Sequence, residues 1–293
     1  GYSAYNWFFN ISKRINENHQ LSLTAFGSPQ THNQRKPLYA GLSIEEWDKV
    51  AKWTGEKNKY RYNAVYGFDN NGKERSSMTN TYHKPQISLN HQWQIDHKSS
   101  LSTALYMSIG RGSGYSGQGR TSAYRSMWNG SSNGKLLYNF RKEDGTFDYG
   151  AIQDMNAASE TGSNMVMSKS NNNHMWYGLL STYTNEILPG LELSAGVDVR
   201  YYVGQHTNEI IDLYDGEYFI DDADRRNVKP ENNIAALDPN WKYEKLTVGD
   251  IVYRDYDGHV HQEGVFAQLE YSIDKVNTFI SGSLSNTGYW RVD

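Results

Sequence analysis

Acidic side chains that stand next to one another are the first candidates for chemistry in this sequence. Glu45 and Glu46 are adjacent, and Asp221, Asp222 and Asp224 lie close together. Two carboxyl groups can act as general acid and general base when their surroundings hold their pKa values apart. Adjacent acids in polar segments are more often solvated, and no constellation for covalent or acid–base catalysis stands out. We therefore expect no catalytic residues and no enzymatic activity.

Candidate metal ligands are equally sparse. The Asp221 cluster and Asn227 offer oxygen atoms that suit calcium, but the glycine and the closing glutamate of a calcium-loop pattern are missing. His259 and His261 share one face of a strand, which allows metal binding without predicting it. The absence of cysteine rules out thiolate ligands and disulfides. We predict no metal and no cofactor, with loop-bound calcium as the open alternative.

Aromatic residues give the best candidates for ligand binding. They gather in two polar segments, where flat rings could stack on a ligand while polar neighbours fix its orientation. Taken one at a time, each ring is more often a packing residue than a ligand contact. The candidates are Trp47, Trp53, Tyr60, Tyr62 and Tyr66 in the first segment and Tyr115, Tyr124 and Trp128 in the second.

The elements that must position these side chains are β-strands with one apolar side. In the clearest segment, Leu191, Leu193, Ala195, Val197, Val199 and Tyr201 alternate with Glu192, Ser194, Asp198 and Arg200. Segments around 21–25, 87–95 and 101–109 repeat the alternation, with His91 as one exception. The polar series would be costly inside a packed core. Asp198 and Arg200 need water or each other, so the pattern predicts one wet side and one lipid-facing side.

Short and long connections alternate along the chain. Stretches 12–18, 96–99, 186–190 and 274–277 are typical of tight hairpin turns. The segments from Pro29 to Tyr82, Arg111 to Asn172 and Gln205 to Asp257 are far longer than ordinary loops. An outer-membrane barrel shows this asymmetry, with short turns in the periplasm and long loops outside. An interfacial aromatic girdle is expected near the turns, although strand propensity alone would also explain it; its members are Trp7, Phe9, Trp93, Tyr183 and Tyr271.

Local signals inside the long segments predict their structure. Ser43 and Glu46 form a capping box ahead of Trp47 and Val50, which predicts a short amphipathic helix. The run GRGSGYSGQGR at 110–120 lacks the ending of a phosphate-binding loop, so we interpret it as a flexible loop. His174 and the preceding asparagines are interpreted as the polar beginning of the next strand.

Composition excludes several other classes of protein. Of the 293 residues, 37% are hydrophobic and 14% are aromatic, and the mean hydropathy is -0.78. No stretch approaches the roughly 18 apolar residues of a membrane-spanning helix, and so aromatic a chain is not disordered. The net charge of -4, with basic residues scattered among acids, gives no footprint for nucleic acid. Because no signal peptide precedes Gly1, we take the chain as a mature or excised piece.

Three stretches carry a family resemblance. They are AFGSPQTHNQR at 25–35, GVDVRYY at 196–202 running on to His206 and Asp212-Leu213, and SLSNT at 283–287 ahead of Tyr289, Trp290, Arg291 and Asp293. The first resembles a motif at an outer strand end, and the others resemble later strands, of TonB-dependent outer-membrane receptors that carry a carboxypeptidase-regulatory-like domain. Together the three stretches span most of the chain, and their order and spacing support the resemblance.

The resemblance implies an all-β fold: an antiparallel transmembrane β-barrel segment in which residues 1–293 supply about eight strands of a barrel of about 22. Its long extracellular loops would contain short helices and bind a scarce nutrient, such as a siderophore, haem or an oligosaccharide, for energised import. The implied location is the bacterial outer membrane, with membrane lipid as one partner. The TonB complex would act through a plug domain that this chain does not contain, and Asp198 and Arg200 would face the lumen or the plug. Whether a surface lipoprotein caps the barrel is left open.

Two other classes of protein remain in view. The chain could form a complete eight-stranded barrel that serves as an adhesin or anchor, with Tyr106, Tyr202 and Phe266 filling its interior. It could also be a soluble carbohydrate-binding β-protein or glycan hydrolase. That class ranks last, because no helix or second sheet is predicted to cover the apolar stripes.

Overall fold

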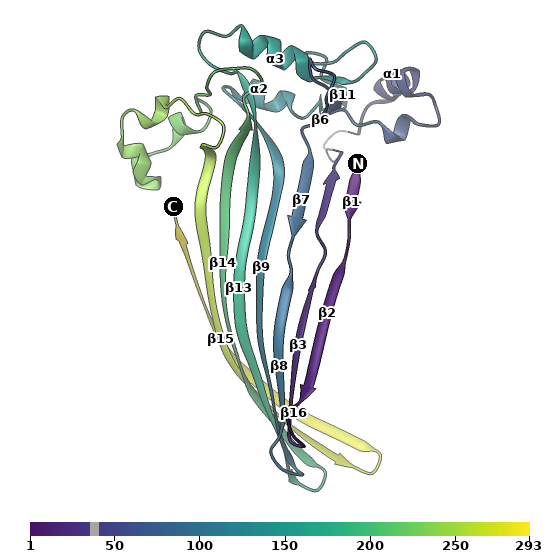
Figure 1. Ribbon diagram of the computed structural model, residues 1–293, viewed down its shortest axis with the longest axis vertical. Helices are drawn as coiled ribbons and strands as arrows, with labels where there is room; N and C mark the ends of the chain where they lie inside the picture. Colours follow the sequence, from purple (N-terminus) through teal and green to yellow (C-terminus); the bar gives the residue numbers. More distant parts are fainter. Residues whose placement is uncertain (36–40) are drawn as a thin grey trace.

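A single curved antiparallel sheet dominates the computed structural model, which describes residues 1–35 and 41–293. Figure 1 shows long strands running between tight turns at one end and a cluster of helices and loops at the other. The 11 strands of this sheet are β1 (Tyr2–Ala4), β2 (Trp7–Arg14), β3 (His19–Gly27), β4 (Gln30–Asn33), β7 (Thr79–His83), β8 (Gln86–Gln94), β9 (Ser99–Gly119), β13 (Met165–Leu188), β14 (Leu191–Asp212), β15 (Ile251–Ile273) and β16 (Val276–Val292). Because β1 and β2, β3 and β4, and β7 and β8 are halves of interrupted strands, the sheet is about eight strands wide, as predicted.

The tight turns form where the sequence predicts them, and hydrogen bonds from the backbone to a side chain stabilise two of them. The Asn16 carboxamide accepts hydrogen bonds from the amides of Asn18 and His19. Asp96 accepts in the same way from Lys98 and Ser99. Asn and Asp favour turns because their short side chains can bond to the backbone just ahead. These turns fix the register of the hairpins that they join.

Two neighbouring ladder rows show the two sides of the sheet. One row joins Ile11, Leu23, Leu89, Leu105, Leu179 and Val199 as direct partners across six strands. The adjacent row, on the opposite side, joins Asn10, Thr24, Ser88, Tyr106, Gly178, Arg200, Gln262 and Thr287. We call the side of Leu105 the apolar face and the side of Tyr106 the polar face. The predicted alternation is thus continuous from strand to strand.

The apolar face is uncovered. Ile11 is 57% exposed, Leu105 is 49% exposed and Val199 is 42% exposed. Leu284 on β16 reaches 75%. A water-soluble monomer rarely leaves so large an apolar surface open, and no second layer of the protein lies over these residues. No helix among the described residues is long and apolar enough to cross a membrane.

The hairpin turns step along the ladder from one hairpin to the next. The last pairs before the first, second and fourth turns are Arg14 with Gln20, Gln94 with Ser100, and Ile273 with Val276. When the ladder partners are followed from strand to strand, each turn lies farther along the strand direction than the previous turn, by about one residue for every strand crossed. With a rise of about 3.3 Å per residue and a strand spacing of about 4.8 Å, the strands tilt by roughly 35–40°, as in closed barrels.

This tilt accounts for polar residues on the apolar face. Glu263 is the ladder partner of Val199, yet it lies farther from its own turn than Leu105 does from its turn. The tilt therefore carries Glu263 and the adjacent His261 to the outer margin of the apolar band. Asn286 donates a 3.4 Å hydrogen bond to Glu263 there. His91, the exception in the alternation, stacks on His19 near the turn end of the sheet.

Two predictions about the strand ends were wrong. The glycine-rich run at 110–120 is not a flexible loop, because β9 continues to Gly119 and pairs with β13 as far as Met165. His174 and its asparagine neighbours accordingly lie inside β13 and not at its beginning. A period-two glycine pattern suits a strand whenever neighbouring side chains need room.

The expected aromatic girdle forms only in part. Trp7 stands at the end of β2 remote from the turn, where its indole donates to His83, whereas Trp93, Tyr183 and Tyr271 lie near the turns.

The long connections fold together at the end of the sheet opposite the turns (Figure 1). We call residues 41–78, 120–164 and 213–250 the loop cap. It contains α1 (Ile44–Thr54), η1 (Lys59–Arg61), β5 (Tyr66–Phe68), β6 (Glu74–Ser76), α2 (Ser122–Met127), β10 (Ser131–Ser132), β11 (Lys135–Leu136), β12 (Phe147–Asp148), α3 (Tyr149–Ala157), η2 (Arg225–Asn227), η3 (Pro230–Asn232), η4 (Ile234–Leu237) and η5 (Trp241–Tyr243). The Ser43 cap of α1 confirms the predicted helix, since its side chain accepts from the Glu46 amide.

The loop cap has its own hydrophobic cores. One gathers Trp128, Phe147, Tyr149, Ile152 and Tyr214 over Met165 and Met167 of β13. A second gathers Phe219 and Leu246 with Val166, Ile210 and Val252. Strand β12 of the second connection pairs with β5 of the first. The cap is therefore a packed unit anchored on the strand ends.

Candidate functional site

A shallow trough lies on the polar face just below the loop cap. Its floor is β9, where Gly112 and Gly114 occupy successive positions on this face. A β-carbon on Gly112 would meet no atom closer than 3.4 Å, and one on Gly114 would meet only the Thr79 carbonyl at 3.8 Å. The absence of side chains leaves backbone exposed there. We call this hollow, of about 520 Å³, the glycine trough.

Hydrogen-bonding and aromatic side chains form the walls of the glycine trough. Tyr82 and Asn80 of β7 stand on one side, and Ser170 and Asn172 of β13 stand on the other. Behind the β13 wall, His206 of β14 bonds to the Asn172 carboxamide at 2.8 Å and stacks on Tyr256 at 4.9 Å between ring centroids. The walls thus combine flat rings with polar groups, as ligand sites often do.

Two cationic side chains, Lys84 and Arg254, lie on opposite sides of the glycine trough. The Lys84 Cε lies 3.9 Å from the place of a β-carbon on Gly112. From β15, the Arg254 guanidinium donates to the Ser170 hydroxyl. All ion pairs among the described residues lie elsewhere, so neither cation is neutralised by a carboxylate. The neighbouring acids of β15, Asp255 and Asp257, alternate onto the opposite face.

A buried polar cluster adjoins the trough. Asn208, the ladder partner of Ser170, is 1% exposed, and its Oδ1 has no hydrogen-bond partner. The Arg254 Nε is likewise buried and unpartnered. Buried polar atoms without a partner are uncommon, because each forfeits its bonds to water. Both atoms are closed to solvent and lie outside the trough lining, so they belong to the packing around the trough.

The predicted lumen pair lies farther down the polar face. Arg200 and Asp198 approach to 3.4 Å, and the Tyr106 hydroxyl contacts both side chains, at 3.2 Å from Arg200 Nε and 3.4 Å from Asp198 Oδ1. The guanidinium also lies over the Trp176 ring, 5.9 Å from its centroid. Sequence reasoning placed the two charges on one face but could not supply Tyr106, which comes from another hairpin.

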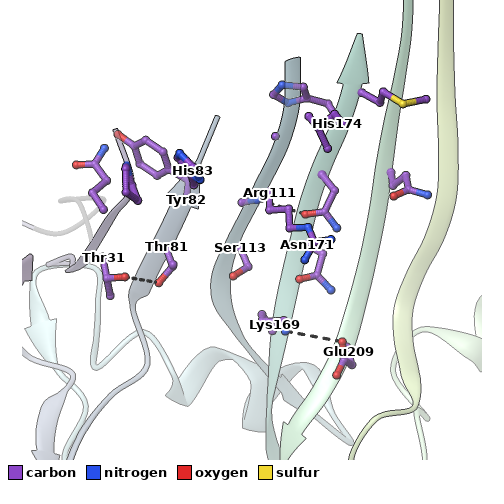
Figure 2. Close-up of a pocket in the computed structure, with 18 of the residues that line it drawn as sticks. Thr31, Thr81, Tyr82, His83, Arg111, Ser113, Lys169, Asn171, His174 and Glu209 are labelled. Atoms are coloured by element: carbon purple, nitrogen blue, oxygen red, sulfur yellow. Dashed lines mark hydrogen bonds and ion pairs between the residues drawn. The ribbon is translucent and has the colours of Figure 1, made fainter. Parts of the chain in front are cut away.

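The opposite, apolar side carries a second hollow, of about 800 Å³, above the apolar band. Figure 2 shows Thr31 and Thr81 bonded across it and Lys169 facing Glu209, which lie 3.0 Å and 3.9 Å apart respectively. Ser113 and Asn171 complete the same ladder row. This hollow differs from the glycine trough because its lysine is already paired.

Some of the aromatic residues predicted to contact a ligand are buried in the loop cap, and others are accessible. Trp128 was expected to be accessible to a ligand, but it is 3% exposed in the cap core, where its indole donates to the Gln118 carbonyl at 2.9 Å. Its ring needs the space above Gly117, which no side chain could share. Tyr124 packs against the same core. Tyr115 lies on β9 and not in a loop, and it borders the glycine trough.

The remaining predicted contacts lie in the first connection and stay candidates. Trp47 and Tyr60 pair at 5.4 Å between ring centroids, and Tyr60 is 65% exposed. Trp53 lies 6.0 Å from Tyr62, and Tyr66 packs on Phe68. Burial raises the pKa of Tyr62 to about 12, and its hydroxyl bonds to the Gly145 carbonyl. Only the Trp47 and Tyr60 pair is well placed to meet a ligand from outside.

Sequence reasoning missed Lys84, Arg254 and the glycine floor. The alternate glycines at 110, 112 and 114 were the available signal, because such spacing clears one face of a strand. The two cations gave no signal, since residues 85–253 separate them along the chain and only folding brings them together. Within the described ranges, no group of three or more histidine, aspartate and glutamate side chains is placed to hold a metal ion.

An acidic cluster links the third connection to β15. Asp221 is 1% exposed and accepts hydrogen bonds from the amides of Asp224 and Tyr253, each at 3.3 Å. Burial, reinforced by the nearby Asp224 charge, raises the pKa of Asp221 to about 6. Asp222 and Asp224 instead pair with Arg120 and Arg125. The cluster therefore joins two connections of the loop cap.

The raised pKa of Asp221 predicts how the cap responds to pH. The folded cap holds this proton more tightly than the unfolded chain does, so stability falls as pH rises from about 4 to about 6 and then levels off. Hydrogen exchange of residues 213–250, with the 41–78 connection as internal reference, would measure this. Faster exchange of 213–250 at pH 7 than at pH 4.5, after correction for intrinsic rates, is expected; the reverse order would contradict it.

Comparison with known proteins gives a likeness of fold alone. No protein-family model and no curated protein matches the sequence. The ferric-catecholate import receptor Fiu from E. coli K12 aligns in its open form over 98% of this chain and 38% of its own, with 9% identity and a TM-score of 0.47. The ferric preacinetobactin receptor BauA from Acinetobacter baumannii aligns over 99% and 36%, with 9% identity and a TM-score of 0.42. This chain thus spans well under half the length of these receptors.

Proposed function

We propose that this chain forms part of the wall and the external loops of a TonB-dependent receptor in a bacterial outer membrane. The observation that carries the proposal is the uncovered apolar face, continuous across six strands from Ile11 to Val199, with a polar row directly behind it. A sheet of this kind is stable with lipid on one side and water on the other. The tilt of about 35–40° inferred from its registers suits a closed barrel.

Closure of that barrel needs further strands. Within the described residues, β2 pairs only with β3, and β16 pairs only with β15. Unpaired backbone groups are costly in lipid, so strands of a longer chain would have to cover both edges. A complete eight-stranded adhesin would instead require the two edges to pair with each other, which they do not do here.

The receptor role rests on the loop cap and the hollow beneath it. A packed cap on the strand ends, with aromatic rings and two cations without ion pairs around the glycine trough, is suited to capturing a small molecule from outside. We propose that the captured nutrient passes through the barrel with energy from TonB, transmitted by a plug domain. A surface lipoprotein that closes over the Trp47 and Tyr60 pair would be a further partner. The soluble carbohydrate-binding alternative would have to leave the apolar face in water.

Cysteine labelling on intact cells would test the topology. These 293 residues contain no cysteine, so single replacements report one position each once any cysteine outside them in the full-length protein is changed to serine. Asp144→Cys in the loop cap is expected to react with a membrane-impermeant maleimide, whereas Lys98→Cys in a tight turn is expected to react only after lysis. Labelling of both positions on intact cells, or of Lys98→Cys alone, would contradict the proposed orientation.

Nutrient import needs a separate experiment. A strain that lacks the gene is expected to grow more slowly on one defined source of iron or carbon, and restoration by the wild-type gene would identify the nutrient. Normal growth and normal uptake of every scarce source tested would contradict the import role.

A further inference from the structure

We propose that the glycine trough binds a small anion, so that the nutrient captured under the proposed function, on which this inference rests, is anionic. The chemical class comprises compounds that present several carboxylate, phosphate or phenolate oxygens on a compact frame. The juxtaposition that carries the inference is Lys84 and Arg254 converging from opposite sides on a floor without side chains.

The first step is the asymmetry of charge between the two faces at this height. On the polar face, Lys84 and Arg254 reach toward the floor formed by Gly112 and Gly114. The acids of β14 and β15 at this height, Glu209, Asp255 and Asp257, alternate onto the apolar side. On the strands of the polar face, Asp198 lies eight ladder positions lower and is held by Arg200. The cap residue Asp221 lies closer, because it accepts a hydrogen bond from the Tyr253 amide next to Arg254, but it forms no ion pair with that arginine. The trough therefore has two cations beside it, and neither takes part in an ion pair of the described residues.

The second step is that the two cations are not used by the fold. Several arginines near the cap are matched with acids, as Arg75 is with Asp69 at 2.9 Å and Arg120 is with Asp222 at 3.1 Å. Arg254 has only the Ser170 hydroxyl, and its Nε is buried without a partner. Arg254 is only half-buried and Lys84 is exposed, so water solvates part of each charge, and an anionic ligand would provide the counter-charge that neither has.

The third step concerns shape and neutral contacts. Asn208, the ladder partner of Ser170, is 1% exposed and lies outside the lining, so Ser170 and Asn172 supply the neutral polar contacts on this wall. Tyr82 and Tyr115 offer flat surfaces in the lining, whereas His206 and Tyr256 stack on each other beyond the Asn172 wall. A volume of about 520 Å³ admits a molecule of small-metabolite size. Bidentate contact with Arg254 would favour planar oxygen groups over a lone halide.

The test uses the full-length receptor in detergent micelles. The probes are pyranine, an aromatic trisulfonate followed by fluorescence anisotropy, and citrate, followed by calorimetry. We expect Lys84→Gln and Arg254→Gln each to weaken binding roughly tenfold, because each removes one charge-assisted contact. Binding should also weaken steeply with added salt, and Lys84→Arg should retain it within about twofold.

Matched variants separate the site from general charge and from folding. Arg111→Gln removes a cation from the opposite face of the same strand, next to Gly112, and is expected to leave binding unchanged. Gly114→Leu should block the trough without a clash, whereas Gly282→Leu, which faces open space on β16, is its neutral counterpart. Unaltered heat-modifiable migration on gels would show that each variant is folded.

The outcomes are decisive in both directions. Loss of binding in Lys84→Gln and Gly114→Leu, with retention in Arg111→Gln, supports the anion site. Binding of neither anion, or equal binding by wild type and Lys84→Gln, overturns it. A weakening in Arg111→Gln alone would place the anion in the hollow of Figure 2 and equally overturn the inference. The proposed function would survive any of these results if the loop-cap cysteine still faced outside and the deletion strain still lacked one nutrient.

Discussion

Replacement of Leu179 by arginine is expected to destabilise the membrane-inserted protein by about 2–4 kcal/mol. Leu179 lies on the apolar face of β13, between its ladder partners Leu105 and Val199. A guanidinium at this depth would have to leave water for hydrocarbon, and charged substitutions on the lipid side of barrels carry a penalty of that size. Urea unfolding of the full-length protein in lipid vesicles would measure the loss.

The adjacent residue provides the control for this prediction. Leu180 pairs with Asp198 on the polar face and is 41% exposed. Leu180→Arg introduces the same side chain on the same strand, next to an acid, so we expect a change of less than about 1 kcal/mol. Equal destabilisation by the two variants would mean that the apolar face does not contact lipid, and the proposed function would lose its main support.

Truncation of Trp128 to alanine is expected to unfold the loop cap while leaving the strands intact. The ring is 3% exposed and lies 5.5 Å from Tyr214 and 6.3 Å from Tyr149 between centroids. Removing a large buried aromatic side chain costs about 3–5 kcal/mol, and the Gln118 carbonyl would lose its indole donor as well. A cap built on two small cores has little stability in reserve.

Limited proteolysis of the full-length protein would detect this effect. Cleavage within 41–78, 120–164 and 213–250 is expected to accelerate strongly in Trp128→Ala, while fragments containing β9, β13 and β14 stay protected. Tyr60→Ala, which removes a ring that is 65% exposed, should leave the cleavage rate near that of the wild type. Unchanged proteolysis of Trp128→Ala would show that the core does not hold the cap together.

The two cores also explain how the glycine trough keeps its form. Met167 and Gly117 belong to β13 and β9 just beyond the trough, and Trp128 packs on both. On the other side, Val252 of β15 is held by Phe219 and Leu246, two positions from Arg254. The strand ends that carry the trough are thus clamped by packing and not left to fray. The Trp128→Ala variant should therefore also weaken anion binding.

Some features could be predicted from the sequence because they depend on residues that are close together in the chain. Period-two alternation in Leu191 to Tyr201 predicted a strand with two unlike sides, and the short polar stretches predicted the turns. The capping box at Ser43 predicted α1, because an N-cap acts on an amide only three residues away. Asp198 and Arg200 were placed together on the wet side for the same reason.

Other features were misread because the deciding contacts are remote. The glycine-rich run at 110–120 has the composition of a flexible loop, but pairing with Met165 to His174 of β13 makes it a strand. Trp128 looks like an exposed ring in a polar segment, yet Tyr214 and Phe147, from other parts of the chain, bury it. The local sequence does not show which distant residue packs against a given glycine in the folded protein.

By itself the sequence determined that this chain forms strands with one apolar and one polar side, joined by tight turns and long connections, because strand periodicity and turn chemistry act over a few residues. Only the tertiary structure decided that the connections build one cap, that the rows join into an uncovered apolar face, and that Lys84 and Arg254 meet over Gly112. Register and long-range packing bring those groups together, and the free energy that selects them belongs to pairs of residues far apart in the chain.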